Sequence, residues 1–108
     1  MDCIFCKIIA GDIPSTKIDE TDNLIAIKDI APKAPIHYLI IPKKHSADIR
    51  AWDTADLPLA GEIFAMAQQL SQQQKNCDFR LIISNGYDGG QRVFHTHVHF
   101  LAGGKFSE

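Results

Sequence analysis

Short apolar runs, separated by glycine and proline, divide the chain into predicted elements. The run at residues 3–10 has the length of a one- to two-turn helix, and Gly11 should end it. Leu24–Lys28 and Ile36–Ile41 are predicted strands, with Pro42 ending the second. The second strand is apolar almost without interruption, which predicts that both of its faces are covered.

One longer segment has helical periodicity. Thr54 or Asp56 is suited to cap this helix, and Pro58 is tolerated in its first turn. The predicted buried stripe follows the spacing of a helix face and consists of Ala60, Ile63, Phe64, Ala67 and Leu70.

Two further strands are predicted in the last third of the chain. The first covers residues 79–84, and the second runs from Val93 to Ala102, where Gly103 and Gly104 follow. Between them, residues 85–90 form a turn that contains three glycines. Strands joined by loops around one main helix predict an α+β fold with a largely antiparallel sheet.

Length and charge limit the function classes. The 108 residues suffice for one domain, and the formal net charge of −2 argues against a general nucleic-acid-binding surface. The chain contains no apolar run of about 18 residues, the length of a membrane span. Its N-terminus lacks the order of charged and apolar residues that marks a signal peptide, so a cytoplasmic protein is expected.

Three of the five histidines occur at alternating positions in the last predicted strand. His95, His97 and His99 should therefore share one face, about 6.6 Å apart at each step. The opposite face should bury Phe94, Val98 and Phe100, together with Thr96, which would need a hydrogen-bond partner there. The residues alone leave two readings of the histidine row: chelation of a catalytic metal, or nucleophilic catalysis by one imidazole.

The glycine-rich turn that precedes the histidine row can contribute to either chemistry. Backbone N–H groups of such a turn can surround a phosphate, and Asn85 and Gln91 can add neutral donors. On its own the turn is equally typical of an ordinary hairpin. The turn and the histidine row together favour phosphoryl chemistry.

The segment from Gly89 to Leu101 resembles the His-φ-His-φ-His-φ-φ signature of the histidine-triad (HIT) superfamily. Cys3–Ile9, Asp29–Pro32 and Ile40–His45 match further segments in the same order, and together they resemble the Hint branch of nucleoside phosphoramidate hydrolases. The resemblance implies a HIT-like α+β fold in a single domain, residues 1–108. This fold has a mainly antiparallel sheet of about five strands, one main helix and a short N-terminal helix.

The resemblance also implies a role for each histidine of the row. His97 is the expected nucleophile, which attacks the α-phosphorus of a purine nucleoside 5′-phosphoramidate and forms a nucleotidyl-histidine. His99 is expected to donate a hydrogen bond to a phosphate oxygen or to the leaving group, and His95 to support the site. No metal is required for the attack itself.

A nucleotide-binding site follows from the same resemblance. Asp29, by itself a typical turn residue, is expected to accept both ribose hydroxyls. The base is expected in a slot of apolar residues, and the phosphate against residues of the glycine-rich turn. The expected nucleotide-binding residues are Phe5, Ile8, Ile27, Asp29, Ile30, Asn85, Gly90, Gln91, Arg92, His97 and His99. Arg92 departs from the pattern, because a serine often contacts phosphate at this position.

Two alternative functions remain open. They are a dinucleoside polyphosphate hydrolase of another HIT branch and a nucleotide-binding scaffold protein with little turnover.

A homodimer is expected because the apolar helix around Ile63–Ala67 and the strand Arg80–Ile83 leave surface that a twofold partner can cover.

The pair Cys3-x-x-Cys6 has a spacing that allows two thiolates to bind one metal. Two small residues on a short helix and a redox pair are the other readings. By resemblance to HIT relatives with this pair, His45 and His95 would complete a structural Cys₂His₂ zinc site.

Overall fold

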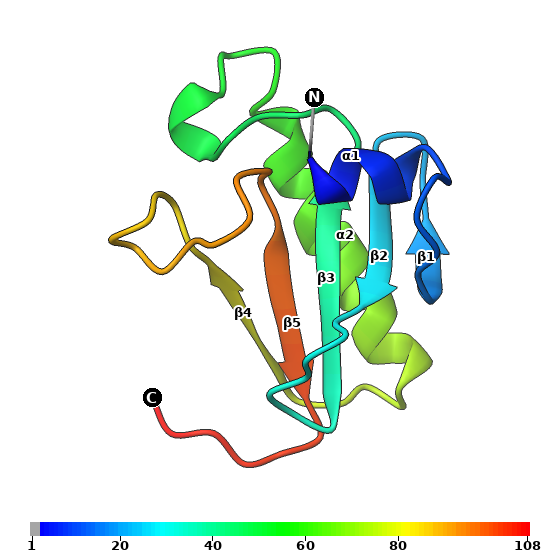
Figure 1. Ribbon diagram of the computed structural model, residues 1–108. Helices are drawn as coiled ribbons and strands as arrows, with labels where there is room; N and C mark the ends of the chain where they lie inside the picture. The colour runs from blue at the N-terminus through cyan, green and yellow to red at the C-terminus, as the bar shows by residue number, and fades with distance from the viewer. Residues whose placement is uncertain (1–2) are drawn as a thin grey trace.

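The computed structural model describes residues 3–108, which form a five-stranded antiparallel sheet in the order β1-β2-β3-β5-β4 (Figure 1). This α+β arrangement confirms the predicted fold class. The elements are α1 (Ile4–Ile9), β1 (Lys17–Glu20), β2 (Leu24–Lys28), β3 (Ile36–Pro42), the short 3₁₀ helix η1 (Ile49–Ala51), α2 (Pro58–Gln73), β4 (Phe79–Ile83) and β5 (Val98–Ala102).

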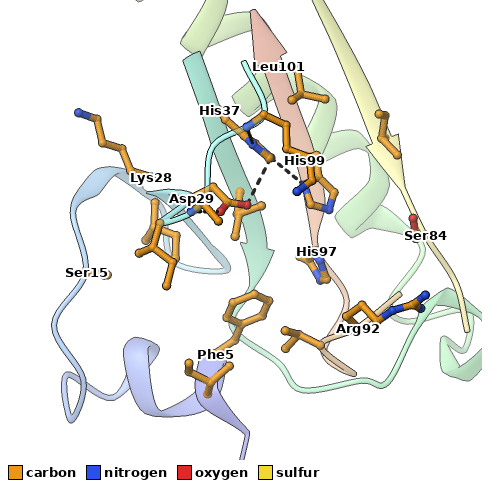
Figure 2. Close-up of a pocket in the computed structure, with 18 of the residues that line it drawn as sticks. Phe5, Ser15, Lys28, Asp29, His37, Ser84, Arg92, His97, His99 and Leu101 are labelled. Carbon is orange, nitrogen blue, oxygen red and sulfur yellow. Dashed lines mark hydrogen bonds and ion pairs between the residues drawn. The ribbon is translucent and has the colours of Figure 1, made fainter. Parts of the chain in front are cut away.

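Strands β2 and β3 bury both of their faces, which was predicted from the apolar sequence of β3. On one face Leu24, Ile40 and Phe100 form one cluster with α2 residues that include Ile63 and Leu70. The opposite face carries a second, smaller cluster, which consists of Phe5 from α1 together with Ile25, Ile27, Leu39 and Ile41. The sheet is therefore covered by α2 on one face and partly by α1 on the other (Figure 1), and His37, His97 and His99 lie on the α1 face (Figure 2).

The last strand is shorter than predicted. It begins at Val98 rather than Val93, because its pairing with β3 stops at Ile40 and its pairing with β4 stops at Ile83. The preceding segment instead binds a different part of the chain: the Thr96 amide donates to the Ser46 carbonyl at 2.8 Å. The Thr96 hydroxyl lies 2.7 Å from the Ser46 hydroxyl, so this buried polar side chain has the partner that it needs. The prediction that Phe94 enters the core is wrong, since its side chain is 49% exposed.

The main helix also differs in two details. Leu57 occupies the N-cap position and makes no side-chain cap, so neither Thr54 nor Asp56 caps the helix. The Asp56 carboxylate instead accepts from Lys44 Nζ at 2.6 Å and from the Asp53 amide at 3.2 Å.

The buried stripe of α2 is rotated from the predicted one. Ile63, Ala67 and Leu70 are buried, and Met66 joins them. The other two predicted members are on the surface: Ala60 is exposed, and Phe64 is 63% exposed.

Strand β1 was not expected from the apolar pattern. Three of its four residues are charged, and only Ile18 packs against the core. Charged residues are typical of an edge strand, which has only one neighbour, β2. None of the helices in the described part of the chain is long and apolar enough to cross a membrane.

Candidate active site

A cavity of about 710 Å³ opens beside the histidines on the α1 face of the sheet (Figure 2). Its wall comes from α1, the end of β2 and the loop that follows, β3, β4, β5 and the glycine-rich turn. Ten of the predicted site residues line it: Phe5, Ile8, Ile27, Asp29, Ile30, Gly90, Gln91, Arg92, His97 and His99.

His97 lies directly before β5 and is buried. Its Nδ1 is 2.8 Å from the carbonyl oxygen of His95, an atom that can only accept a hydrogen bond. Nδ1 therefore carries the proton, and Nε2 carries the lone pair. Burial lowers the pKa of His97, only partly opposed by this hydrogen bond and by Asp29, so the neutral ring is the stable form at neutral pH.

A fourth histidine determines which nitrogen of His99 carries its proton. The Lys33 amide donates to Nδ1 of His37 at 3.0 Å, so the proton of a neutral His37 ring is on Nε2. That Nε2 lies 2.9 Å from Nδ1 of His99 and donates to it. His99 consequently carries its own proton on Nε2. Burial, with the neighbouring His97 and His37, lowers the pKa of His99 to about 4.

Asp29 lies at the end of β2, beside His37 (Figure 2). Its Oδ1 accepts from the Ala31 amide at 2.8 Å, which is the turn role that its sequence position suggests. Its Oδ2 is 3.4 Å from Nε2 of His37. The carboxylate thus keeps lone pairs available on the cavity side.

The glycine-rich turn shapes the cavity mostly through its backbone. Gly90 has a φ of 100°, a conformation that other residues rarely adopt. The Gln91 side chain is 1% exposed; it donates to the Ala47 and Val93 carbonyls and accepts from the Gly86 amide. Its amide group therefore holds the turn and is not free to bind a ligand.

Asn85 is the one predicted nucleotide-binding residue that the structure does not bring to the cavity. Its Oδ1 accepts from the Ile49 amide at 3.0 Å, so it positions the 3₁₀ helix. Ser84, one residue earlier, lines the cavity instead.

The four predicted zinc ligands form a cluster next to the cavity. The ligand atoms of Cys3, Cys6, His45 and His95 all lie within 4.8 Å of one another. Cys3 Sγ is 3.3 Å from His95 Nδ1, and Cys6 Sγ is 3.4 Å from His45 Nδ1. Zinc–sulfur and zinc–nitrogen bonds of about 2.3 and 2.0 Å place tetrahedral ligand atoms about 3.3–3.8 Å apart, so these separations fit one ion.

The hydrogen bonding of His95 also fits a metal. Its Nε2 is 2.7 Å from the Pro42 carbonyl oxygen and must donate, which leaves the lone pair on Nδ1. That Nδ1 lies 3.1 Å from Nδ1 of His45. A cation bound here would accept the lone pairs of both nitrogens in place of a hydrogen bond between them.

Sequence reasoning missed His37. All five histidines fall into two groups, His45 with His95 and His37 with His97 and His99. A histidine in the otherwise apolar strand β3 was the available signal, because a buried polar side chain needs a partner.

Comparison with known proteins places the chain in a family. A family model described as "Scavenger mRNA decapping enzyme C-term binding" matches residues 2–107. An uncharacterized HIT-like protein of Synechocystis sp. is 42% identical over 107 residues, covering 98% of this chain and 94% of the relative.

Two solved structures share the fold over nearly their full length. A HIT family hydrolase from Legionella pneumophila has a TM-score of 0.93 and 41% identity, with 98% of this chain and 96% of that chain covered. A histidine triad protein from Clostridium difficile has the same TM-score and identity, with 100% and 96% covered. The chain therefore belongs to the histidine-triad (HIT) family of hydrolase-like, nucleotide-binding proteins.

Proposed function

We propose that the protein hydrolyses purine nucleoside 5′-phosphoramidates through a nucleotidyl intermediate on His97. The observation that carries this proposal is the hydrogen bond from His97 Nδ1 to the His95 carbonyl. It holds a neutral imidazole with its Nε2 lone pair available in the cavity, as a nucleophile at phosphorus requires.

In the first step the Nε2 lone pair of His97 forms a bond to the α-phosphorus. The bond from phosphorus to the leaving nitrogen breaks, its electron pair stays on that nitrogen, and the proton on His99 Nε2 transfers to it. The nucleotidyl-imidazolium on His97 is positive, and its Nδ1–H keeps its acceptor on His95. The positive ring of His97 lies close to the negative charge left on the His37–His99 pair, since the ring centres of His97 and His99 are 5.1 Å apart.

In the second step water attacks the same phosphorus. Water gives one proton to His99 Nε2, the bond from phosphorus to His97 breaks, and its electron pair returns to Nε2 of His97. The products are a nucleoside monophosphate and a free amine, and both histidines regain their starting protonation.

The nucleoside is placed by residues on the α1 side of the cavity. We expect Asp29 Oδ2 to accept from the ribose, since Oδ1 is already used by the Ala31 amide. Phe5 and Ile27 are buried walls of the base slot, whereas Ile30 is 96% exposed and stands at its rim. An apolar slot selects a purine by fit and discriminates little between adenine and guanine.

A structural zinc ion is the second part of the proposal. Cys3, Cys6, His45 and His95 would hold it in a closed site that fastens α1 to the segment before β5. Zinc there would fix His95, whose carbonyl orients His97. The ion would supply stability and positioning only, and the residues of the chemical step are not among its ligands.

A homodimer is the third part. Among the described residues, apolar side chains are exposed on the edge strand β4, at Phe79 and Ile83, and on α2 at Phe64. We propose that a second copy covers this surface across a twofold axis. Light scattering at micromolar concentration should give the mass of two chains, and Phe64→Asp should give one; a monomeric wild type would exclude the dimer.

The experiment that tests the hydrolase is a comparison of substrates. The wild-type protein, incubated separately with adenosine 5′-phosphoramidate and with diadenosine polyphosphates, should release adenosine monophosphate from the phosphoramidate much faster. Faster cleavage of the polyphosphates would assign the chain to that reaction instead. Binding of adenosine monophosphate without turnover of either compound would indicate a scaffold protein.

A further inference from the structure

The cavity extends past the histidine pair, away from the proposed nucleoside slot. Asp29 lies on one side of His97 and His99, whereas Ser84 and Arg92 lie on the other, next to β4 (Figure 2). On this second side the wall is completed by Arg80 and Ile82 of β4 and by Phe106 near the C-terminus. We call these five residues, Arg80, Ile82, Ser84, Arg92 and Phe106, the distal lobe.

The distal lobe is basic in a chain that is acidic as a whole. The chain carries 11 lysines and arginines against 13 aspartates and glutamates. The distal lobe has two arginines and no carboxylate, whereas the nucleoside side has Lys28 and Lys33 together with Asp29, the single acidic residue of the whole lining. A cavity wall with one sign of charge raises the local concentration of ligands of the opposite sign.

Both guanidinium groups retain donor capacity. Arg92 Nη1 donates to the Tyr87 and Gln91 carbonyls, and its guanidinium stacks 4.0 Å from the centre of the Tyr87 ring. Its Nε and Nη2 groups make no hydrogen bond to any described residue. Stacking and the two backbone bonds thus fix the orientation of a charge that has no carboxylate partner among the described residues.

Arg80 is held in a similar way by residues near the C-terminus. Its Nη2 donates to the Ser107 carbonyl, and its guanidinium lies 4.9 Å from the centre of the Phe106 ring. In residues 3–108 neither Arg80 nor Arg92 forms an ion pair with a carboxylate. Fixed guanidinium groups with free donors match the planar, bidentate geometry of carboxylate and phosphate.

The proposed reaction assigns an occupant to this lobe. In an in-line displacement the leaving group departs from the side of phosphorus opposite the nucleophile, and the nucleoside already occupies the Asp29 side. We propose that Arg80 and Arg92 select a leaving group that carries an anion, either a carboxylate or a phosphate. This inference rests on the proposed nucleotidyl transfer and names the leaving-group class of the same site.

A matched pair of substrates tests the inference directly. Both are phosphoramidates of adenosine 5′-monophosphate, one formed with the amine of β-alanine and the other with that of β-alaninamide, so they differ only in a carboxylate against a neutral amide. Wild-type kcat/KM should favour the carboxylate by about tenfold, the size of one charge-assisted hydrogen bond. Diadenosine tetraphosphate supplies the phosphate-bearing leaving group as a third substrate.

The variants Arg80→Gln, Arg92→Gln and their double combination should reduce this preference, with the double variant close to a ratio of one. Lys75→Gln removes the same charge from an exposed position outside the cavity lining and should keep the wild-type ratio. The double variant also shows which anion the lobe recognises. A larger fall in kcat/KM for the β-alanine substrate would indicate a carboxylate, and a larger fall for diadenosine tetraphosphate would indicate a phosphate.

The possible failures are distinguishable. Equal rates for both phosphoramidates in the wild-type protein, together with a diadenosine tetraphosphate rate that the double variant leaves unchanged, would overturn the inference and leave the hydrolase standing. A preference that persists in the double variant would also overturn it, because the arginines would not be its cause. Turnover of none of the three substrates would instead refute the proposed function.

Discussion

Replacement of His37 is the most informative test of which ring nitrogen of His99 carries the proton. His37 touches no proposed reacting atom; it acts through His99, to which its Nε2 donates at 2.9 Å. The Lys33 amide holds the other ring nitrogen as an acceptor at 3.0 Å. In His37→Leu this donor disappears, so Nδ1 of the half-buried His99 ring loses its partner and nothing retains the proton on Nε2.

The expected loss follows from the cost of one buried, unsatisfied polar atom. That cost is about 1–3 kcal/mol, and each 1.36 kcal/mol on the barrier changes the rate tenfold. His37→Leu should therefore lower kcat on a nucleoside phosphoramidate about 5- to 150-fold, with a smaller change in the affinity for adenosine monophosphate. His37→Gln should recover much of the rate, because its side-chain NH₂ group can reach the position of Nε2 and donate to His99.

Steady-state kinetics of the three proteins, with a thermal melt of each, measures both effects. A purely structural role for His37 would lower the melting temperature without a specific effect on kcat, and Gln would not rescue turnover. Equal kcat values for His37→Leu and the wild type would refute the assignment of proton positions.

Three further predictions concern the sugar, the pH profile and the metal. Asp29→Ala should weaken binding of adenosine monophosphate by about 1.5–3 kcal/mol, or about 10- to 150-fold, and reduce the preference for ribose over deoxyribose; unchanged titrations with both sugars would show that Asp29 is only a turn residue. Because the pKa of His99 is lowered to about 4, its ring stays neutral at pH values well below the ordinary histidine pKa of about 6.5. We therefore expect kcat/KM to stay level from pH 7 to about 5 and to fall only at more acidic pH. The groups that face this ring are His97, His37, Asp29 and Lys33. An acid limb centred near pH 6.5, measured with a substrate of constant charge, would contradict the expected neutral ring. Elemental analysis of protein purified without chelator should give about one zinc per chain, and Cys3→Ala should lose it and melt at a lower temperature; metal-free protein whose melting temperature zinc does not change would exclude the site.

The parts of the fold that were predictable are those controlled by local apolar patterns. The bounds of β2 match the prediction, and β3 differs by one residue, because continuous apolar runs between turn residues specify buried strands. The start of β5 depends instead on where its neighbours end, at Ile40 and Ile83, which no pattern within residues 93–97 records. The exposed Phe64 and Phe94 show the same limit, since burial depends on what packs opposite.

Some residues of the candidate site could also be predicted from the sequence, and others could not. The four residues of the metal cluster were predictable from the resemblance to HIT relatives, which implies His45 and His95 beside Cys3 and Cys6; the spacing of the two cysteines alone left other interpretations open. The place of Asn85 and the engaged amide of Gln91 depend on bonds to Ile49 and Ala47, about 40 residues away in sequence. The role of His37 likewise arises from the pairing of β3 with β5, a contact between residues 62 positions apart.

The central claim is covalent catalysis at one nitrogen, and intact-protein mass spectrometry after rapid acid-free quenching tests it most directly. Wild-type protein mixed with excess adenosine 5′-phosphoramidate should gain the mass of one adenylyl group, and peptide mapping should place it on His97. His97→Ala should remain folded, bind adenosine monophosphate, gain no such mass and lose nearly all turnover. An adenylyl group on another residue, or near-normal turnover by His97→Ala, would contradict the account.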